Sequence, residues 1–306
     1  MINVLFAARP ERWPLYETPL TEAFAEAGLQ VHLATDIPAE MVDYIIYAPN
    51  SPLQDFTPYT RAKAVLNLWA GVEGIVNNPT LHIPLCRMVD MALTQGMVEW
   101  VTGHVLRHHL GMDAHILAQP GEWAPKAPPV AWDRKVTVLG LGELGTACAQ
   151  SLARIGFDTH GWARSEKTVE GVTCHTDLSE ALTGAGGVVL LLPDTPATTQ
   201  IMNAGTFAKL APGAFLLNPG RGPLIDDDAL LDALNSGQLS HATLDTFRTE
   251  PLPQGHPFWH HAGITVTPHI ASETRPKWSA RTIADNIRRN ESGAPLLHLV
   301  DRSRGY

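Results

Sequence analysis

The chain has 306 residues, 44% of them hydrophobic and 17% charged, and its formal net charge is −9. This composition is typical of a globular protein, and the length leaves room for two domains, each with its own core. It argues against an intrinsically disordered protein. The negative charge disfavours a protein whose main partner is nucleic acid, although a local basic pocket is compatible with it.

The first residues and the cysteines indicate where in the cell the protein is expected. The opening run MINVLFAA lacks a positively charged leader and reads as a first strand. No apolar run reaches the roughly 20 residues of a membrane span, so we expect no membrane partner. The cysteines, Cys86, Cys148 and Cys174, show neither paired nor metal-ligand spacing. We therefore expect buried thiols and a cytoplasmic protein.

The first 90 residues alternate strand-like apolar runs with helix-length or turn-rich segments. The runs cover residues 2–8, 29–35, 43–48 and 64–70. This alternation predicts a small parallel-sheet domain. A long helix is predicted over residues 94–119, and the prolines of residues 120–132 end it and mark the crossing to a second unit.

A second series of strand-like runs begins at Lys135 and is punctuated by helical segments. The runs cover residues 135–140, 157–162, 186–192, 213–218, 241–245 and 263–268. Apolar strands separated by helices predict a doubly wound parallel sheet. The segment 277–290 is predicted to form an amphipathic helix after the last strand.

A glycine pattern follows the first of these runs and resembles a dinucleotide-binding turn. Gly140 allows the tight turn, Gly142 lets the backbone approach a pyrophosphate, and Gly145 lets helix and strand pack closely. Glu143 and Leu144 open the helix whose unpaired N–H groups face the phosphates. The pattern alone is a weak signal, and a purely structural glycine turn is the alternative.

The next strand ends where an acidic residue commonly holds an adenosine ribose. The chain has Ala163, Arg164 and Ser165 there, followed by Lys167. Two cations and a hydroxyl suit a 2′-phosphate, so we expect NADP(H) to be preferred and NAD(H) to be possible. The alternative is a solvated basic turn.

Four later loops also follow strand-like runs and are expected at the carboxyl edge of the sheet, where open α/β folds bind ligands. One holds Leu192, Pro193 and Thr198, with an ordinary loop as the alternative. The others place Arg221, Glu250 and His269 at the same edge. The arginine suits a carboxylate, the histidine suits proton delivery to a carbonyl oxygen, and the glutamate suits orientation of the imidazole ring.

The glycine pattern, NPGRG, LDTF followed by EPLP, and TPHIA resemble the D-2-hydroxyacid dehydrogenases. The segments NLWAGVEGI and IPLCRM resemble their glyoxylate/hydroxypyruvate reductase branch. The resemblance covers most of the chain and implies a Rossmann cofactor domain over residues 99–276. That domain is inserted into a flavodoxin-like substrate domain formed by residues 1–98 and 277–306, with the active site between the two.

The resemblance also implies roles for single residues. It makes Arg221 the substrate anchor, Glu250 the partner of the histidine and His269 the acid/base. Asn218, Pro219 and Asp245 then belong to the cofactor site, with Asp245 contacting the nicotinamide carboxamide. The backbone at Ala70 and Gly71, beside Trp69, holds the substrate carboxylate. Two residues depart from the family pattern: Pro219, where a small residue is common, and Trp69, where glycine is frequent.

The predicted activity is reduction of a small 2-oxo acid, such as glyoxylate or hydroxypyruvate, to the D-2-hydroxy acid. The alternatives are a reductase for a bulkier 2-oxo acid and a non-catalytic protein that senses dinucleotides and serves in regulation. The resemblance implies a homodimer in which Trp123 reaches the neighbouring site, while packing of Trp123 into a core is the other interpretation. We expect no metal, and we predict that His104 and His108 lie on a solvated or packed helix face.

Overall fold

The computed structural model describes residues 1–116, 121, 123, 125 and 127–305. The chain forms two compact units, one of Met1–Leu93 with Glu273–Tyr306 and one of Thr94–Ser272. These limits lie five and four residues from the predicted ones. In the described part of the chain, no helix is both long enough and apolar enough to cross a membrane.

The first unit is built on a parallel five-stranded sheet with the strand order β2-β1-β3-β4-β5. Its strands are β1 (Ile2–Ala7), β2 (Val31–Ala34), β3 (Tyr44–Tyr47), β4 (Ala64–Asn67) and β5 (Leu85–Cys86). This is the flavodoxin-like order, as predicted. The short β5 was not predicted, because two residues give no periodicity.

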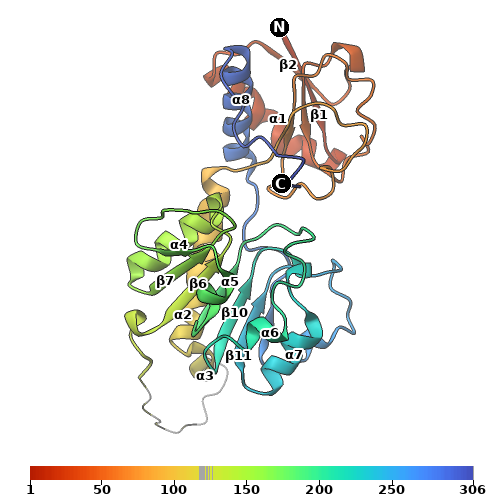
Figure 1. The fold of residues 1–306 in the computed structure, drawn as a ribbon. Helices are drawn as coiled ribbons and strands as arrows, with labels where there is room; N and C mark the ends of the chain where they lie inside the picture. Colours follow the sequence, from red (N-terminus) through yellow and green to blue (C-terminus); the bar gives the residue numbers. More distant parts are fainter. Residues whose placement is uncertain (117–120, 122, 124, 126, 306) are drawn as a thin grey trace. The chain divides into compact units, whose positions relative to one another are not determined.

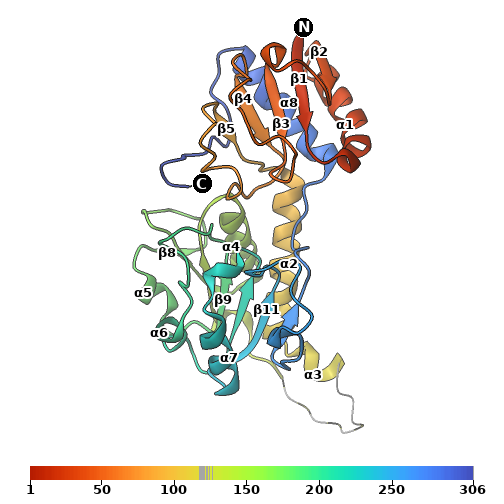
Figure 2. The ribbon, with the colours of Figure 1, turned by 90° about the vertical axis from the view of Figure 1, so that its right-hand side faces the viewer.

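Two helices from opposite ends of the sequence pack together on this sheet. Helices α1 (Trp13–Glu26) and α8 (Pro276–Glu291) lie side by side in Figure 1, and Figure 2 shows α8 behind β1 and β3. The buried face of α8 follows helical spacing and consists of Ala280, Ile283, Ala284 and Ile287. The end of the chain thus completes the core of the first unit, which makes the second unit an insertion.

The second unit contains a parallel seven-stranded sheet with the order β12-β11-β10-β9-β6-β7-β8. Its strands are β6 (Lys135–Leu139), β7 (Asp158–Trp162), β8 (Thr173–His175), β9 (Gly187–Leu190), β10 (Ala214–Asn218), β11 (Leu239–Leu244) and β12 (Ile264–Val266). Counted from β6, this is the Rossmann order with a seventh strand added at one edge. The predicted fold class is therefore confirmed.

Helices cover both faces of this sheet, which explains why its central strands are apolar throughout. One face packs against α2 (Met91–His109) and α4 (Glu143–Ile155). The other packs against α5 (Leu178–Leu182), α6 (Ala204–Phe207) and α7 (Asp227–Asn235). Neighbouring residues of β10 alternate between the two cores, with Phe215 in one and Leu216 in the other.

The predicted single helix over residues 94–119 is wrong in its extent. Helix α2 ends at His109, and a short α3 (Met112–Ile116) follows. The break lies at Gly111, whose φ of +64° is left-handed and ends a helix. Residues 117–119 of the prediction lie outside the described residues.

The expectation of buried thiols is confirmed for two of the three cysteines. All three are free, Cys86 and Cys148 are buried, and Cys174 is half-buried. Burial raises the pKa of both Cys86 and Cys148 to about 12, so these two thiols stay protonated and unreactive at neutral pH.

Candidate active site

The glycine turn between β6 and α4 leaves a helix start open to a ligand. A Cβ on Gly145 would lie 1.7 Å from the carbonyl oxygen of Gly140, so only glycine lets α4 pack this closely on the turn. A Cβ on Gly142 would meet no heavy atom of the described residues within 4 Å. Gly142 caps α4, and no described side chain bonds the first N–H groups of the helix. These groups, from Glu143 onward, are suited to bind a phosphate.

This turn lies at the point where the strand order of the sheet reverses. Strand β6 pairs with β7 on one side and with β9 on the other, which is the switch point where doubly wound sheets bind nucleotides. A Cβ on Gly140 would lie 2.5 Å from the carbonyl oxygen of Leu191, so the turn touches the loop after β9. The predicted cofactor residues of the two loops, Leu192 and Pro193 among them, therefore lie at one edge.

The segment after β7 carries the predicted basic group. The amide of Ala163 donates to the carbonyl of His175 at 3.1 Å, which fixes this segment against the neighbouring strand. Arg164, Ser165 and Lys167 follow and are exposed. Because β7 pairs with β6, they lie at the same edge of the sheet as the glycine turn.

Thr198 and Asn218 hold the shapes of their loops. The Thr198 hydroxyl donates to the Pro193 carbonyl at 2.7 Å. The Asn218 side chain donates through Nδ2 to the Arg221 carbonyl at 2.9 Å, and its Oδ1 accepts from the backbone N–H of Gly220 at 3.1 Å. Both side chains are buried, at 4% and 0% exposed. Their bonds to backbone explain how these loops, with Pro219 in the second, keep one conformation.

Glu250 and His269 form the hydrogen-bonded pair that the sequence suggests. The Glu250 Oε2 lies 2.7 Å from His269 Nδ1, while its Oε1 accepts from the Phe247 amide at 2.9 Å. The carboxylate is thereby fixed at one oxygen by backbone and at the other by the imidazole ring. With Nδ1–H donated to glutamate, Nε2 is the nitrogen that can exchange a proton with a ligand.

The buried carboxylate of Asp245 holds the backbone around His269. Its Oδ1 accepts from the Thr267 hydroxyl at 2.6 Å and from the Ile270 amide at 2.9 Å. Its Oδ2 accepts from the Ala271 amide at 2.9 Å. His269 has a φ of +55°, which is uncommon for a residue with a side chain and persists where the surroundings determine it. Asp245 therefore positions the imidazole, a role the sequence did not reveal.

The Arg221 loop lies against the loop that carries Glu250. A Cβ on Gly222 would lie 2.1 Å from the carbonyl carbon of Phe247, so the two backbones touch where glycine allows it. Arg221 is half-buried, and its Nη1 donates to the Gly220 carbonyl at 2.6 Å. The structure thus brings together the loops of all three predicted catalytic residues.

In the first unit, the loop after β4 has the form of an anion cradle. The buried Asn67 donates through Nδ2 to the carbonyls of Trp69 and Gly71, both at 2.9 Å. The amides of Ala70 and Gly71 have no acceptor among the described residues. With its carbonyls held inward, this loop presents free N–H donors, which suit a carboxylate. Asn67 was missed, although a polar residue that ends the apolar run AVLN is a visible signal.

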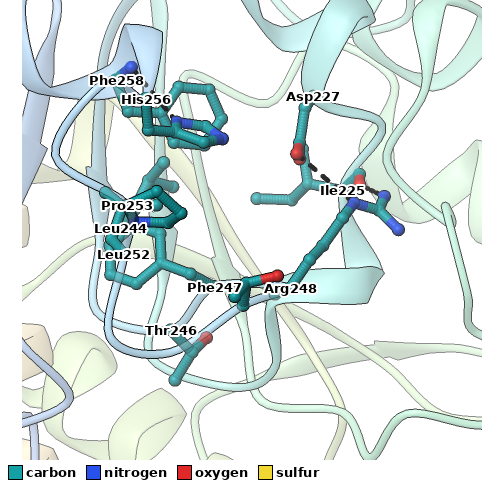
Figure 3. Close-up of a pocket in the computed structure, with 12 residues that line it drawn as sticks. Ile225, Asp227, Leu244, Thr246, Phe247, Arg248, Leu252, Pro253, His256 and Phe258 are labelled. Carbon is teal, nitrogen blue, oxygen red and sulfur yellow. Dashed lines mark hydrogen bonds and ion pairs between the residues drawn. The ribbon is translucent and has the colours of Figure 1, made fainter.

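The cavity in Figure 3 lies beside the catalytic loops and does not include the catalytic residues. It has a volume of about 180 Å³, and its lining includes Gly222, Phe247 and Arg248. Arg248 pairs with Asp227 at 3.4 Å and bonds the carbonyl of Ile225. Burial raises the pKa of Asp227, although Arg248 opposes that shift. These contacts of Arg248 hold the loop that carries Glu250 against the segment of Ile225 and Asp227.

Comparison with known proteins agrees with this geometry. The sequence model of the D-isomer specific 2-hydroxyacid dehydrogenases, NAD binding domain, matches residues 103–271. The chain belongs to this family of dehydrogenases. The match includes the glycine turn and the loops of Arg221, Glu250 and His269.

Relatives of this dehydrogenase extend the similarity to nearly the whole chain. A glyoxylate/hydroxypyruvate reductase A of Serratia proteamaculans is 41% identical over 257 residues, which cover 80% of this chain and 82% of the relative. A D-isomer specific 2-hydroxyacid dehydrogenase from Xanthobacter autotrophicus, solved with NADPH and MES, is 39% identical. It has a TM-score of 0.92 and covers 100% of this chain and 99% of its own.

A third relative is the NADPH-dependent glyoxylate/hydroxypyruvate reductase of Sinorhizobium meliloti, solved with NADP and sulfate. It is 34% identical, with a TM-score of 0.85 and full coverage of both chains. The predicted family is therefore confirmed, and so is the class of enzyme.

Three residues singled out in the sequence, Trp123, His104 and His108, lie outside the catalytic loops. Trp123 is 96% exposed, so the interpretation that it packs in a core is wrong. The His104 ring lies 4.4 Å from the Trp100 ring at an angle of 52°, and the His108 ring packs against Phe215 at 5.3 Å. Both histidines thus lie on a packed helix face, the second of the two environments that the sequence suggested.

Proposed function

We propose that this dehydrogenase reduces a small 2-oxo acid, glyoxylate or hydroxypyruvate, to the D-2-hydroxy acid with NADPH. The observation that carries the proposal is the Glu250–His269 pair at 2.7 Å, which leaves Nε2 as a proton donor. The names of the similar reductases support the substrate class, and the bound NADPH and NADP of the solved relatives support the cofactor.

In the proposed mechanism, the chain binds the substrate by its carboxylate and protonates its carbonyl oxygen. The Arg221 guanidinium pairs with the carboxylate and polarises the adjacent carbonyl. The amides of Ala70 and Gly71, beside Trp69, donate to the same carboxylate. NADPH, when bound, supplies the hydride to the carbonyl carbon. His269 gives its Nε2 proton to the oxygen, and Glu250 stabilises the charged ring before this transfer.

The proposed cofactor site follows the edge of the second sheet. The N–H groups after Gly142 bind the pyrophosphate, and Asp245 contacts the nicotinamide carboxamide with the acceptor capacity left on Oδ2. The other residues of this site are Gly140, Glu143, Leu144, Gly145, Arg164, Ser165, Lys167, Leu192, Pro193, Thr198, Asn218, Pro219 and His269. Arg164, Ser165 and Lys167 bind the 2′-phosphate, and this group makes NADPH the preferred cofactor.

A panel of 2-oxo acids tests the function. Purified enzyme is assayed with glyoxylate, hydroxypyruvate, pyruvate and a branched 2-oxo acid, each with NADPH and with NADH. We expect the highest kcat/KM with glyoxylate or hydroxypyruvate. A higher value with the branched acid would assign the enzyme to bulkier substrates, and no oxidation of either cofactor would favour a dinucleotide sensor.

Replacing Arg221 with lysine should lower both the affinity for glyoxylate and kcat, because lysine keeps the charge and loses the planar fork. One bidentate contact to a carboxylate is worth about 1.5–3 kcal/mol, so kcat/KM should fall roughly 10- to 150-fold. Steady-state kinetics measure this change. Arg154→Lys, on an exposed turn of α4, is the control and should behave as wild type. Wild-type kinetics in Arg221→Lys would mean that Arg221 is structural.

We also propose that the enzyme is a homodimer. Large apolar side chains concentrate in one stretch of the second unit, and each is more than a third exposed. They are Leu110, Met112, Ile116, Trp123, Val130 and Trp132. Several large apolar side chains exposed in one stretch are typical of an interaction site, and Trp123 is the residue we expect to reach the neighbouring subunit. Light scattering of the purified chain should give twice the monomer mass, and a monomer would contradict the proposal.

A further inference from the structure

Three potential metal ligands meet where α2 and α3 pack beside β11. They are His108 in the last turn of α2, Asp113 in the first turn of α3, and His241 on β11. One ligand atom from each residue lies within 4.8 Å of the other two. All three residues are half-buried. The fold thus brings two imidazoles and a carboxylate from three separate elements to one point.

Each imidazole is oriented by a threonine. His108 Nε2 lies 2.8 Å from the Thr243 hydroxyl, and His241 Nε2 lies 2.8 Å from the Thr265 hydroxyl. A ring that donates Nε2–H keeps its lone pair on Nδ1. Among the described residues, none bonds the Nδ1 of either ring. This is the arrangement of metal-binding histidines, in which the second nitrogen is fixed by an outer partner.

The charges at this point also suit a cation. Burial lowers the pKa of His108 to about 3 and that of His241 to about 4, so both rings are neutral at pH 7. Burial raises the pKa of Asp113, but the hydrogen bond and the positive charge of Arg107, together with the nearby His241 and His108, lower it below its usual range, so the carboxylate is charged. Arg107 Nε lies 2.7 Å from Oδ1 and takes one carboxylate oxygen. A metal would therefore bind Oδ2 of Asp113, and it would share this carboxylate with the positive charge of Arg107.

We propose that His108, Asp113 and His241 form a binding site for a divalent transition metal of the Zn²⁺ class. Two imidazole nitrogens and one carboxylate oxygen are typical zinc ligands, whereas Ca²⁺ and Mg²⁺ require mostly oxygen. A tetrahedral zinc ion holds its ligand atoms about 3.4 Å apart, which is compatible with three ligand atoms that all lie within 4.8 Å of one another. Water completes the coordination.

The proposed role is structural. His241 precedes Asp245 by four residues along an extended strand, which places the two about 13 Å apart. The metal therefore lies away from the groups that orient His269. It joins the end of α2, the start of α3 and β11, which are otherwise linked here by hydrogen bonds and ring contacts.

Zinc binding to chelator-treated, full-length protein tests the proposal by isothermal titration calorimetry. We expect one Zn²⁺ per chain in wild type, binding that is lost in His241→Gln, and at least tenfold weaker binding in Asp113→Asn. Thr265→Val should weaken binding about 10- to 100-fold, since an outer partner of a ligand contributes that much. Co²⁺ should give the visible absorption of a tetrahedral nitrogen and oxygen site in wild type and lose it in His241→Gln.

His82→Gln and Asp133→Asn remove an exposed imidazole and an exposed carboxylate elsewhere and serve as matched controls. Both should bind zinc as wild type does. Circular dichroism establishes whether each variant is folded. If His241→Gln does not fold, the zinc affinity of Asp113→Asn alone tests the proposal. The proposal is overturned if wild type binds no zinc, or if Asp113→Asn binds it with wild-type affinity.

Discussion

The His269→Ala variant is expected to lose roughly 10²- to 10⁴-fold in kcat for 2-oxo acid reduction, which is the range for a general acid/base. Alanine removes the Nε2 proton donor, and Glu250 at 2.7 Å is then left without its partner. The glycine turn of the cofactor site is unchanged, so the Kd for NADPH should stay nearly as in wild type. Steady-state turnover with glyoxylate and a fluorescence titration with NADPH measure the two quantities.

Two further variants show whether this loss comes from proton delivery. Glu250→Gln keeps an acceptor for Nδ1–H and removes the charge, so it should reduce kcat less than His269→Ala does. His260→Ala removes an exposed imidazole from the same part of the chain and should leave turnover unchanged. Wild-type turnover in His269→Ala would remove this histidine from the mechanism.

The sequence predicted that the three catalytic loops lie at the same edge of the second sheet. Parallel strands end at a common edge, and Arg221, Glu250 and His269 each follow an apolar run of strand length. Glycine was a second signal, because the turns at Gly140 and Gly145 leave no space for a side chain. Both features are local and can be recognised before the fold is known.

Other features could not be predicted, because they depend on contacts between distant segments. Asp245 was predicted only as a contact to the cofactor, and its second role depends on three hydrogen bonds that its carboxylate accepts from residues 267–271. The cluster of His108, Asp113 and His241 has no sequence signature, since its members come from different elements. Strands β5 and β8 are too short for periodicity to show them.

The preference for NADPH is the second large effect that we expect, and it follows from the residues after β7. An acid at this place would bind both ribose hydroxyls and repel a 2′-phosphate. The chain has Ala163 there, and the exposed Arg164 and Lys167 supply cations on the same segment. Each charge-assisted contact is worth about 1.5–3 kcal/mol, and about 1.4 kcal/mol corresponds to a factor of ten. Two contacts therefore predict a kcat/KM for NADPH about two orders of magnitude above that for NADH.

The double variant Ala163→Asp with Arg164→Ala should reverse this preference. Aspartate adds an acceptor for the ribose hydroxyls and repels the 2′-phosphate, and loss of Arg164 removes one cationic contact. The KM for NADPH should therefore rise and that for NADH fall, while kcat changes little because the reacting groups lie elsewhere in the unit. Arg154→Ala removes one positive charge from the exposed side of α4, as Arg164→Ala does after β7, and should keep the wild-type ratio. If wild type already uses NADPH and NADH with equal kcat/KM, the segment after β7 is only a solvated basic turn, and cofactor choice must be determined elsewhere.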